Sequence, residues 1–184
     1  MKYDRLIYKG RGDPLERNLI EEWFDLYERD ITSYLVYYTG SMDVEDLVQE
    51  TFLRALNKIS RFNENAHPKT WLISIARNMV IDHYRRNRVW KKLRHIFFHE
   101  QFFSFDMDQC ILLNQQNTFL YKAINSLPAN YKEVIILRGI LDMSSKEVSS
   151  IMKSNENNIN VLYHRSLKKL KIILEKEGYE HGGF

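Results

Sequence analysis

Two stretches of the sequence carry basic side chains with no acidic residue among them. Residues 85–95 include six Lys or Arg residues, and residues 157–171 include four. Cationic side chains neutralise phosphate groups and release their counterions, which is the electrostatic source of affinity for nucleic acids. A single basic run is more often a solvated helix face, but two separate runs shift the balance towards a nucleic-acid partner.

A polar pattern near the C-terminus has residue types that read DNA bases. The segment SSKEVSSIMKSNENNINVLYHRSLKKL predicts a helix-turn-helix, with helices over 146–152 and from about residue 157, and a turn over 153–156. In this motif the second helix enters the major groove, where Asn can pair with adenine and Arg with guanine or a phosphate. A plain helical hairpin is the alternative. The residues expected on the outer face are Asn158, Asn160, Val161, His164, Arg165 and Lys168.

The inner face of this predicted motif is apolar, as a packed helix pair requires. Helical spacing assigns six residues to the contact between the two helices, namely Val148, Ile151, Met152, Ile159, Leu162 and Leu167. This arrangement leaves the polar residues on the opposite side, where they could meet DNA.

The N-terminal part of the sequence has the opposite charge. Residues 13–50 include eleven Asp or Glu residues against two Arg residues, so this part should repel DNA. Asp46, Gln49, Glu50 and Leu53 fall on one face of a predicted helix. Such an acidic, partly apolar face is usually solvated, and the pattern alone assigns it no function.

Helical periodicity predicts the elements that position these residues. Apolar residues recur at helical spacing over 15–38, over 44–60 and after Pro68, and again over 120–127 and after Pro128. Asp43 is expected to cap the second of these helices. The third is expected to bury Leu72, Ile75, Ala76, Met79, Val80 and His83. Over 89–115 the periodicity is poor and five Phe residues have no clear face, so we interpret this stretch as a linker that docks on the protein or on a partner.

These patterns predict an all-α protein of two small helical domains joined by a linker, the C-terminal one with a helix-turn-helix. The 184 residues are 44% hydrophobic, which is enough for packed cores. No apolar run reaches the roughly 18 residues of a membrane span, and the N-terminus lacks the apolar core of a signal peptide, so we expect a cytoplasmic protein. Cys110 is the only cysteine, which excludes an internal disulfide.

No pattern in the sequence supports catalysis or a bound cofactor. His95 and His99 stand four residues apart, but no third metal ligand of suitable spacing lies nearby. The sequence also lacks a Gly-rich phosphate loop, a nucleophile elbow and paired carboxylates suited to acid–base catalysis. We therefore predict a binding protein with no catalytic residue, no metal and no cofactor.

Two long motifs resemble conserved parts of one protein family. The segments DVEDLVQETFLRALNKISRF and PKTWLISIARNMVIDHYRR are similar to the second conserved region of bacterial RNA polymerase sigma factors. The segments LPANYKEVIILR, KEVSSIM and HRSLKKL resemble the fourth region, in the order and spacing of the small extracytoplasmic-function (ECF) type. The resemblance covers about residues 20–90 and 120–172. It implies a first domain over 15–90, a linker over 91–117 and a helix-turn-helix domain over 118–177.

The resemblance implies a role for each group of residues. The face with Asp46, Gln49, Glu50 and Leu53 would dock on the coiled coil of the polymerase's largest subunit, and the second helix of the helix-turn-helix would read the −35 promoter element. Trp71 is more often part of a core than a platform for DNA bases. The implied partners are core RNA polymerase, promoter DNA and an anti-sigma factor. The −10 element would be bound and opened by Phe62, Asn63, Asn65, His67, Arg77, Asn78, Arg85 and Arg86.

The helix-turn-helix departs from the family pattern, and other functions stay open. Lys153 stands where a backbone φ above zero is often needed, and residues 158–162 lack two basic residues that relatives commonly carry. These changes should weaken phosphate attraction and alter the −35 sequence that is read. A stand-alone helix-turn-helix regulator is one alternative and should bind a duplex operator by itself. An adaptor that binds only other proteins is another and should not bind DNA even with polymerase present.

Overall fold

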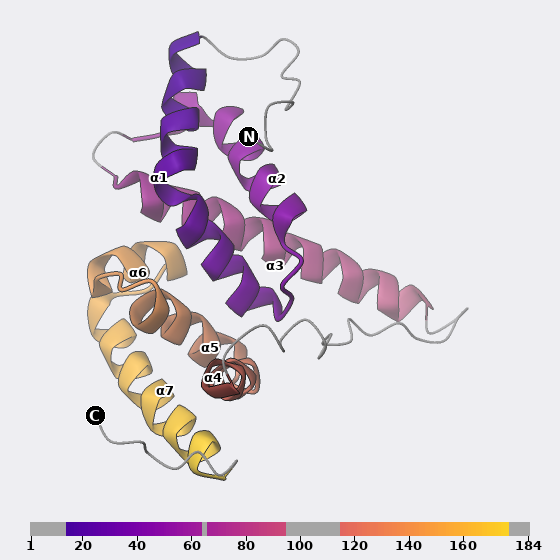
Figure 1. Cartoon of the computed structure of the whole chain (residues 1–184), viewed down its shortest axis with the longest axis vertical. Coiled ribbons are helices and arrows are strands. Elements are labelled where there is room, and N and C mark those ends of the chain that lie inside the picture. The colour runs from indigo at the N-terminus through magenta and orange to yellow at the C-terminus, as the bar shows by residue number, and fades with distance from the viewer. Residues whose placement is uncertain (1–13, 64–65, 95–114, 177–184) are drawn as a thin grey trace.

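The computed structural model describes residues 14–63, 66–94 and 115–176, and every regular element in these ranges is a helix (Figure 1). The predicted all-α class is confirmed. The helices form two groups that follow one another along the chain, drawn from indigo to magenta and from orange to yellow. None of the described helices combines the length and the apolar character that a membrane crossing needs.

The N-terminal domain is built from three helices that pack on one another. Its elements are α1 (Pro14–Thr39), α2 (Glu45–Leu56), the short 3-10 helix η1 (Ile59–Arg61) and α3 (Pro68–Arg94). Each long helix buries one apolar stripe, with Trp23 of α1, Phe52 of α2 and Leu72 of α3 all in the core. The spacing of apolar residues predicts helices because only one side of each helix is buried.

The start of α2 differs from the prediction. The N-cap position is occupied by Val44 rather than the expected Asp43, and no side chain caps this end. The hydroxyl of Ser41 accepts a hydrogen bond from the N–H of Asp43 at 3.1 Å, which fixes Asp43 in the connection before the cap. The carboxylates of Glu45 and Asp46 lie in the first turn, where the positive end of the helix dipole favours negative charge.

The core-facing stripe of α3 ends earlier than expected, because His83 is exposed rather than buried. One residue later the hydroxyl of Tyr84 donates to the backbone carbonyl of Thr39, the last residue of α1, at 3.4 Å. Since α1 ends at Thr39, it does not cover the part of α3 that follows Tyr84. Among the α3 side chains that the structure describes, which end at Tyr84, Val80 is accordingly the last one in the core.

The C-terminal domain contains shorter helices. Its elements are α4 (Gln115–Asn125), α5 (Ala129–Ile135), η3 (Ile136–Ile140), α6 (Ser145–Met152) and α7 (Glu156–Lys176). Pro128 occupies the N-cap of α5, where the missing proline N–H costs no helical hydrogen bond. The element η3 is one π-helical turn that continues α5, and the N–H of Leu141 donates to the carbonyl of Ile136 at 2.9 Å.

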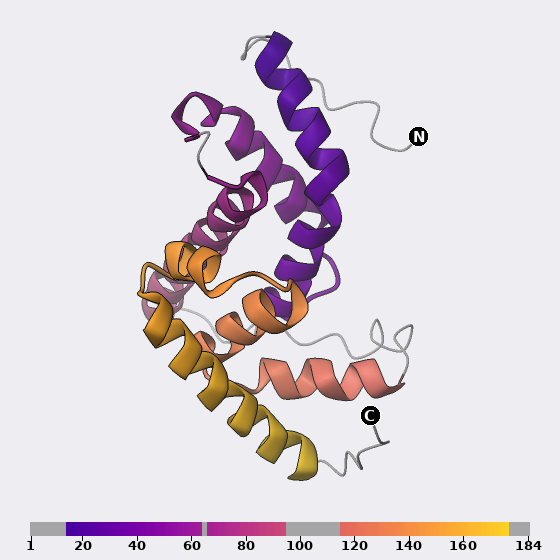
Figure 2. The same cartoon turned by 90° about the vertical axis from the view of Figure 1, so that its left-hand side faces the viewer.

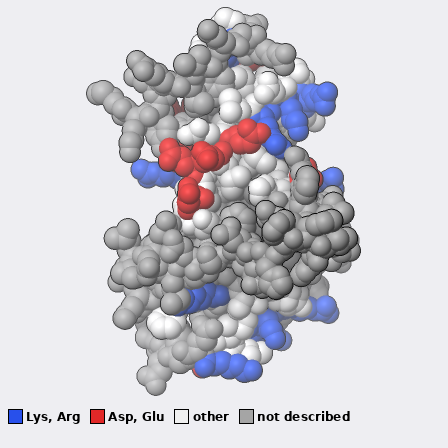
Figure 3. Space-filling view, turned by 90° about the vertical axis from the view of Figure 1, so that its right-hand side faces the viewer, with Lys and Arg blue, Asp and Glu red and all other residues white. Residues whose placement is uncertain are grey.

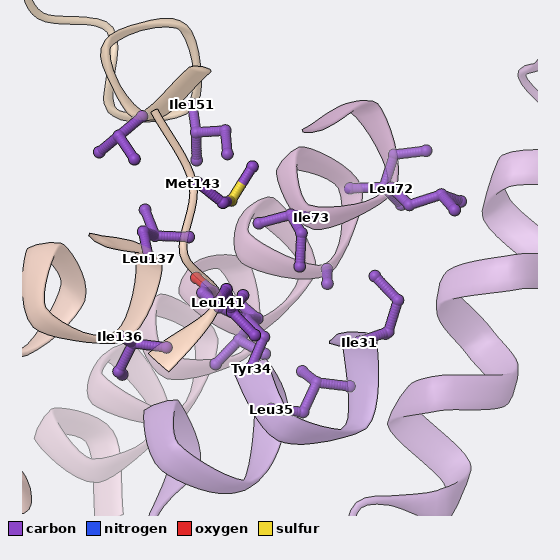
Figure 4. Packing of buried hydrophobic residues seen from close by; sticks show 14 of the residues in the cluster. Ile31, Tyr34, Leu35, Leu72, Ile73, Ile136, Leu137, Leu141, Met143 and Ile151 are labelled. Carbon is purple, nitrogen blue, oxygen red and sulfur yellow. The ribbon is translucent and has the colours of Figure 1, made fainter. Parts of the chain in front are cut away.

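The two domains pack against each other, whereas the sequence predicts domains held together only by a linker. Figure 4 shows Tyr34 and Ile73 of the N-terminal domain beside Leu137, Leu141 and Met143 of the C-terminal domain. Figure 2, turned by 90°, shows the C-terminal domain still directly against α1 and α3. Buried apolar side chains therefore form one cluster that spans both domains.

Candidate functional sites

The first helix of the helix-turn-helix begins with a reciprocal cap. The N–H and the hydroxyl of Ser144 donate to the carboxylate of Glu147 at 2.8 and 2.6 Å, and the N–H of Glu147 donates back to the Ser144 hydroxyl at 3.3 Å. Burial alone would raise the pKa of Glu147, but these bonds and one from Thr70 hold it below its usual value. The spacing of Ser and Glu three residues apart is the signature of such a cap and could have been recognised in the sequence.

The turn between α6 and α7 has the strained backbone that the sequence predicts at Lys153. This residue has φ of 53° and ψ of 50°, in the left-handed region, and it ends α6. The side chain of Asn155 then caps α7 by accepting the N–H of Asn158 at 2.8 Å. The predicted helix-turn-helix is thus confirmed, with the two helices fixed at their meeting point.

The inner face of the motif matches the prediction at most positions. Val148 and Ile151 of α6 and Ile159 of α7 are buried. Leu167 is the exception, because its side chain is 42% exposed. The buried stripe of α7 instead continues through Ser166 and Leu170, since positions seven and eleven residues beyond Ile159 return to the same side of a helix.

The outer face of α7 is open along the length that the sequence assigns to DNA. Every predicted −35 residue is exposed, a set that comprises Asn158, Asn160, Val161, His164, Arg165 and Lys168. The amide oxygen of Asn160 accepts the hydroxyl of Ser145 on α6 at 2.5 Å, which orients the side chain. A carbonyl oxygen has two lone pairs and the amide nitrogen two protons, so this bond leaves both acceptor and donor capacity for a base edge.

The predicted −10 loop is held by an aromatic cluster. Trp71 lies edge-on to Trp23 and Phe62, with ring centroids 5.9 and 5.1 Å apart, so the interpretation of Trp71 as part of the core is supported. Asn63, His67 and Asn78 are exposed. Phe62, at the start of the loop, is therefore packed in the aromatic cluster, while the polar side chains are exposed to solvent.

Three predicted −10 residues lie wholly or in part outside the described residues. Asn65 lies outside the described residues, and Arg85 and Arg86 belong to α3 but their side chains lie outside the described part. Arg77, by contrast, is well placed and forms an ion pair with Glu133 of α5. Arg77 is thus bound to the other domain, whereas Asn63, His67 and Asn78 are exposed to solvent.

The acidic face of α2 is accessible. Asp46 is exposed, and Gln49, Glu50 and Leu53 are half-buried. Glu50 also pairs with Arg54 one helical turn later at 2.7 Å, with both side chains partly in solvent. Figure 3 shows Asp and Glu side chains gathered in one band on this side of the N-terminal domain. Since the four predicted residues are spaced by three, four and seven positions within α2, they share one side of this helix.

Within the described ranges, no group of three or more His, Cys, Asp or Glu side chains could hold a metal ion. The pair His95 and His99 lies outside these ranges. The described residues instead present two accessible faces on separate domains, the acidic face of α2 and the polar and basic outer face of α7.

Both domains match known families. The sequence model of sigma-70 region 2 matches residues 23–89, and that of sigma-70 region 4 matches residues 120–170. The ECF RNA polymerase sigma factor SigX of Bacillus subtilis is 28% identical over 158 residues, which are 83% of this chain and 81% of SigX. The RNA polymerase sigma factor SigV of the same species is 30% identical over 143 residues, 77% of this chain and 81% of SigV.

Solved structures share the arrangement of helices. The sigma factor RpoE, solved in complex with the anti-sigma factor NepR from Bartonella quintana, has a TM-score of 0.68 at 24% identity, over 86% of this chain and 98% of that chain. CnrH, solved with the cytosolic domain of CnrY, has a TM-score of 0.66 at 20% identity, over 87% and 90% of the two chains. The fold thus agrees with the sequence matches, and the chain belongs to the sigma-70 family of RNA polymerase sigma factors, in its ECF group.

Proposed function

We propose that this protein is an alternative sigma factor that binds core RNA polymerase, directs it to promoters with −35 and −10 elements and helps to open the DNA. The proposal rests on one observation above all: a region 2 domain and a region 4 helix-turn-helix domain occur in one chain in the family order. A sigma factor acts by bridging polymerase and DNA, so we assign it no catalytic residue and no cofactor. We place its action in the cytoplasm, where bacterial polymerase meets the chromosome.

We assign polymerase docking to the accessible face of α2. Asp46 and Glu50 supply negative charge and Leu53 supplies apolar area on the same helix side. A surface of this kind suits a basic protein partner better than DNA, because phosphates would be repelled by the carboxylates. The proposed partner surface is the coiled coil of the polymerase's largest subunit.

We assign −35 recognition to the outer face of α7. Asn160 and Arg165 carry the donors and acceptors that read base edges, while Lys168 is suited to phosphate contact. These side chains are exposed, and their helix is anchored by the Asn155 cap and the buried Ile159. Rigid presentation favours base reading because little side-chain and helix ordering is then needed on binding.

We assign −10 recognition to the loop over 62–67 together with Asn78 on α3. An unstacked base can hydrogen-bond to polar side chains such as Asn63, His67 and Asn78 while basic residues hold the backbone. Asn65, Arg77, Arg85 and Arg86 complete this proposed surface. RpoE was solved with an anti-sigma factor, and we propose a partner of that kind for this protein as well.

The test is in vitro transcription with sigma-free core polymerase on a library of genomic fragments. The proposal predicts transcripts that start downstream of a shared pair of sequence elements and that are absent with core polymerase alone. If no promoter-specific transcript is made, the proposal fails. Specific operator binding by the protein alone would then favour the stand-alone regulator, and no DNA binding even with polymerase would favour the adaptor.

A further inference from the structure

One cation of the proposed −10 surface is held by the other domain. The guanidinium of Arg77 donates from Nε and Nη2 to the two separate carboxylate oxygens of Glu133 on α5. The side chain of Arg77 is 18% exposed and that of Glu133 is 6% exposed. While it is bound in this way, the charge of Arg77 is balanced by Glu133 and most of its side chain is buried, so little of it is available to a DNA phosphate.

The ion pair lies in a site built by both domains. Burial alone would lower the pKa of Arg77, but its hydrogen bond to Glu133 raises it above the ordinary value. Burial, with a further contribution from Glu133, raises the pKa of the neighbouring Tyr38 to about 12. A buried carboxylate is tolerated only when its charge is balanced, so Glu133 depends on Arg77 while the domains are in contact.

Further polar contacts between the domains surround the apolar interface. The hydroxyl of Thr70 donates to the carboxylate of Glu147, the residue that caps α6, at 3.2 Å. Lys69 donates to the carbonyl of Leu141 at 3.3 Å, and the hydroxyl of Tyr121 donates to the carbonyl of Val36 at 3.2 Å. The contact between the domains therefore combines one continuous apolar cluster with hydrogen bonds between specific side chains and their partners.

This arrangement is too compact to reach both promoter elements at once. The −35 and −10 positions are about 25 base pairs apart, which is about 85 Å along the DNA at 3.4 Å per step. In the structure, the start of α3 lies against α6 of the helix-turn-helix. The connection over residues 95–114 contains 20 residues, and a chain of that length can extend to about 70 Å. The covalent link thus permits a large separation that the interdomain contact prevents.

We infer that the protein has a closed state, in which Glu133 occupies the guanidinium of Arg77 in place of DNA and the two domains cannot span a promoter. This inference rests on the proposed sigma function. Opening exchanges the Glu133 carboxylate for a DNA phosphate as the partner of Arg77, while α6 and η3 separate from α1 and α3. Glu133 is thus a latch residue that sets how much of the free protein is closed.

The first experiment measures the distance between the domains in the free protein. Fluorophores are placed on cysteines at the exposed positions Ser60 and Ser154, in a Cys110→Ser background that removes the native thiol. The labelled protein with Glu133 intact should show mainly a short distance between the two fluorophores. Glu133→Gln should raise the ratio of open to closed molecules by about tenfold or more, because Arg77 loses its buried counter-charge.

A matched control separates the latch from a general charge effect. Glu175→Gln removes the same charge from the same domain, at an exposed pair with Lys171, and should leave the distance unchanged. The charge swap Arg77→Glu with Glu133→Arg should restore the short distance, a result that a misfolded protein could not produce. An unchanged distance in Glu133→Gln, or no restoration by the swap, would overturn the inference.

The second experiment adds core polymerase and a promoter fragment to the labelled protein. The short distance should disappear as promoter complexes form, and transcripts should appear from the same sample. If transcripts appear while the short distance persists, the closed state is not an obstacle and the inference fails. If no transcript appears with the unlabelled protein, the sigma function itself fails, so the two failures are distinguishable.

Discussion

The basic residues of α3 and α7 carry similar chemistry but stand in different surroundings. Arg165 of α7 is exposed on the outer face of a helix whose opposite side is buried. Arg77 of α3 is turned into the contact between the domains and neutralised by Glu133. A pattern of basic residues thus predicts which side chains could bind DNA, whereas the packing of domains decides which of them are available.

The largest expected effect is the difference in stability between a protein that lacks the Arg77 side chain and one that lacks the Arg165 side chain. Arg77→Ala leaves Glu133 buried without a counter-charge and should lower the free energy of unfolding of the closed protein by about 3–5 kcal/mol. Arg165→Ala removes an exposed side chain and should change the free energy of unfolding by no more than about 0.5 kcal/mol. Chemical denaturation of both variants measures the difference. Equal effects would remove the distinction between the two helices.

The next effect distinguishes base contacts from phosphate contacts on α7. Asn160→Ala should relax selectivity at one or two −35 positions, since a bidentate base contact discriminates by about 1–3 kcal/mol. Lys168→Ala should weaken all promoters alike and reduce the salt slope by about one. Transcription from a library with randomised −35 positions, at several salt concentrations, provides the measurement. Wild-type preferences in Asn160→Ala at every position would show that this face does not read bases.

A smaller effect compares the acidic face of α2 with acidic residues elsewhere. Glu50→Lys should weaken binding to core polymerase by roughly tenfold, because it reverses a charge on the proposed docking surface. Glu175→Lys makes the same change at the far end of α7, where Glu175 is exposed, and should leave core binding unchanged. Equilibrium binding of labelled variants to core polymerase tests this. Similar losses in both variants would point to overall charge rather than to the α2 face.

The smallest expected effect concerns the anchoring of α7. Asn155→Ala removes the side chain that accepts the N–H of Asn158 and should lower the free energy of unfolding by about 1 kcal/mol. Asn157→Ala, two residues later and exposed, is the matched control and should have a smaller effect. Thermal unfolding monitored by circular dichroism compares the two. A loss in the control as large as that in Asn155→Ala would exclude a capping role.

Much of the fold could be predicted from the sequence because its determinants are local. The periodicity of apolar residues predicts the helices, and the left-handed backbone at Lys153 follows from its place in the turn. The exposure of Asn160 and Arg165 follows from the same periodicity. Errors of one position, as at Asp43 and Leu167, arise because a turn or a neighbouring helix shifts which residue faces inwards.

The contact between the domains could not be predicted, since it joins residues far apart in the chain. Ile136, Leu141 and Met143 are apolar whether they complete one domain or cover another. Arg77 and Glu133 are separated by 56 positions, and no local pattern pairs them. The division of the chain at 15–90, 91–117 and 118–177 stays a prediction.

The lysine beside Glu133 has a consequence for how firmly the domains hold together. Lys132 donates to the carbonyl of Tyr38 and to the amide oxygen of Asn125, and burial lowers its pKa. Because the pKa of Lys132 is lower when the domains are in contact than when they are apart, the contact is strongest above the ordinary lysine pKa, and it weakens as the pH falls from that value to the lowered one. Burial of the charged form of Lys132 therefore opposes the attraction that Arg77 and Glu133 supply. Such opposing contributions keep the protein with its domains in contact and the protein with its domains apart close in free energy. A partner that binds one of these two states more tightly can then shift the equilibrium towards it.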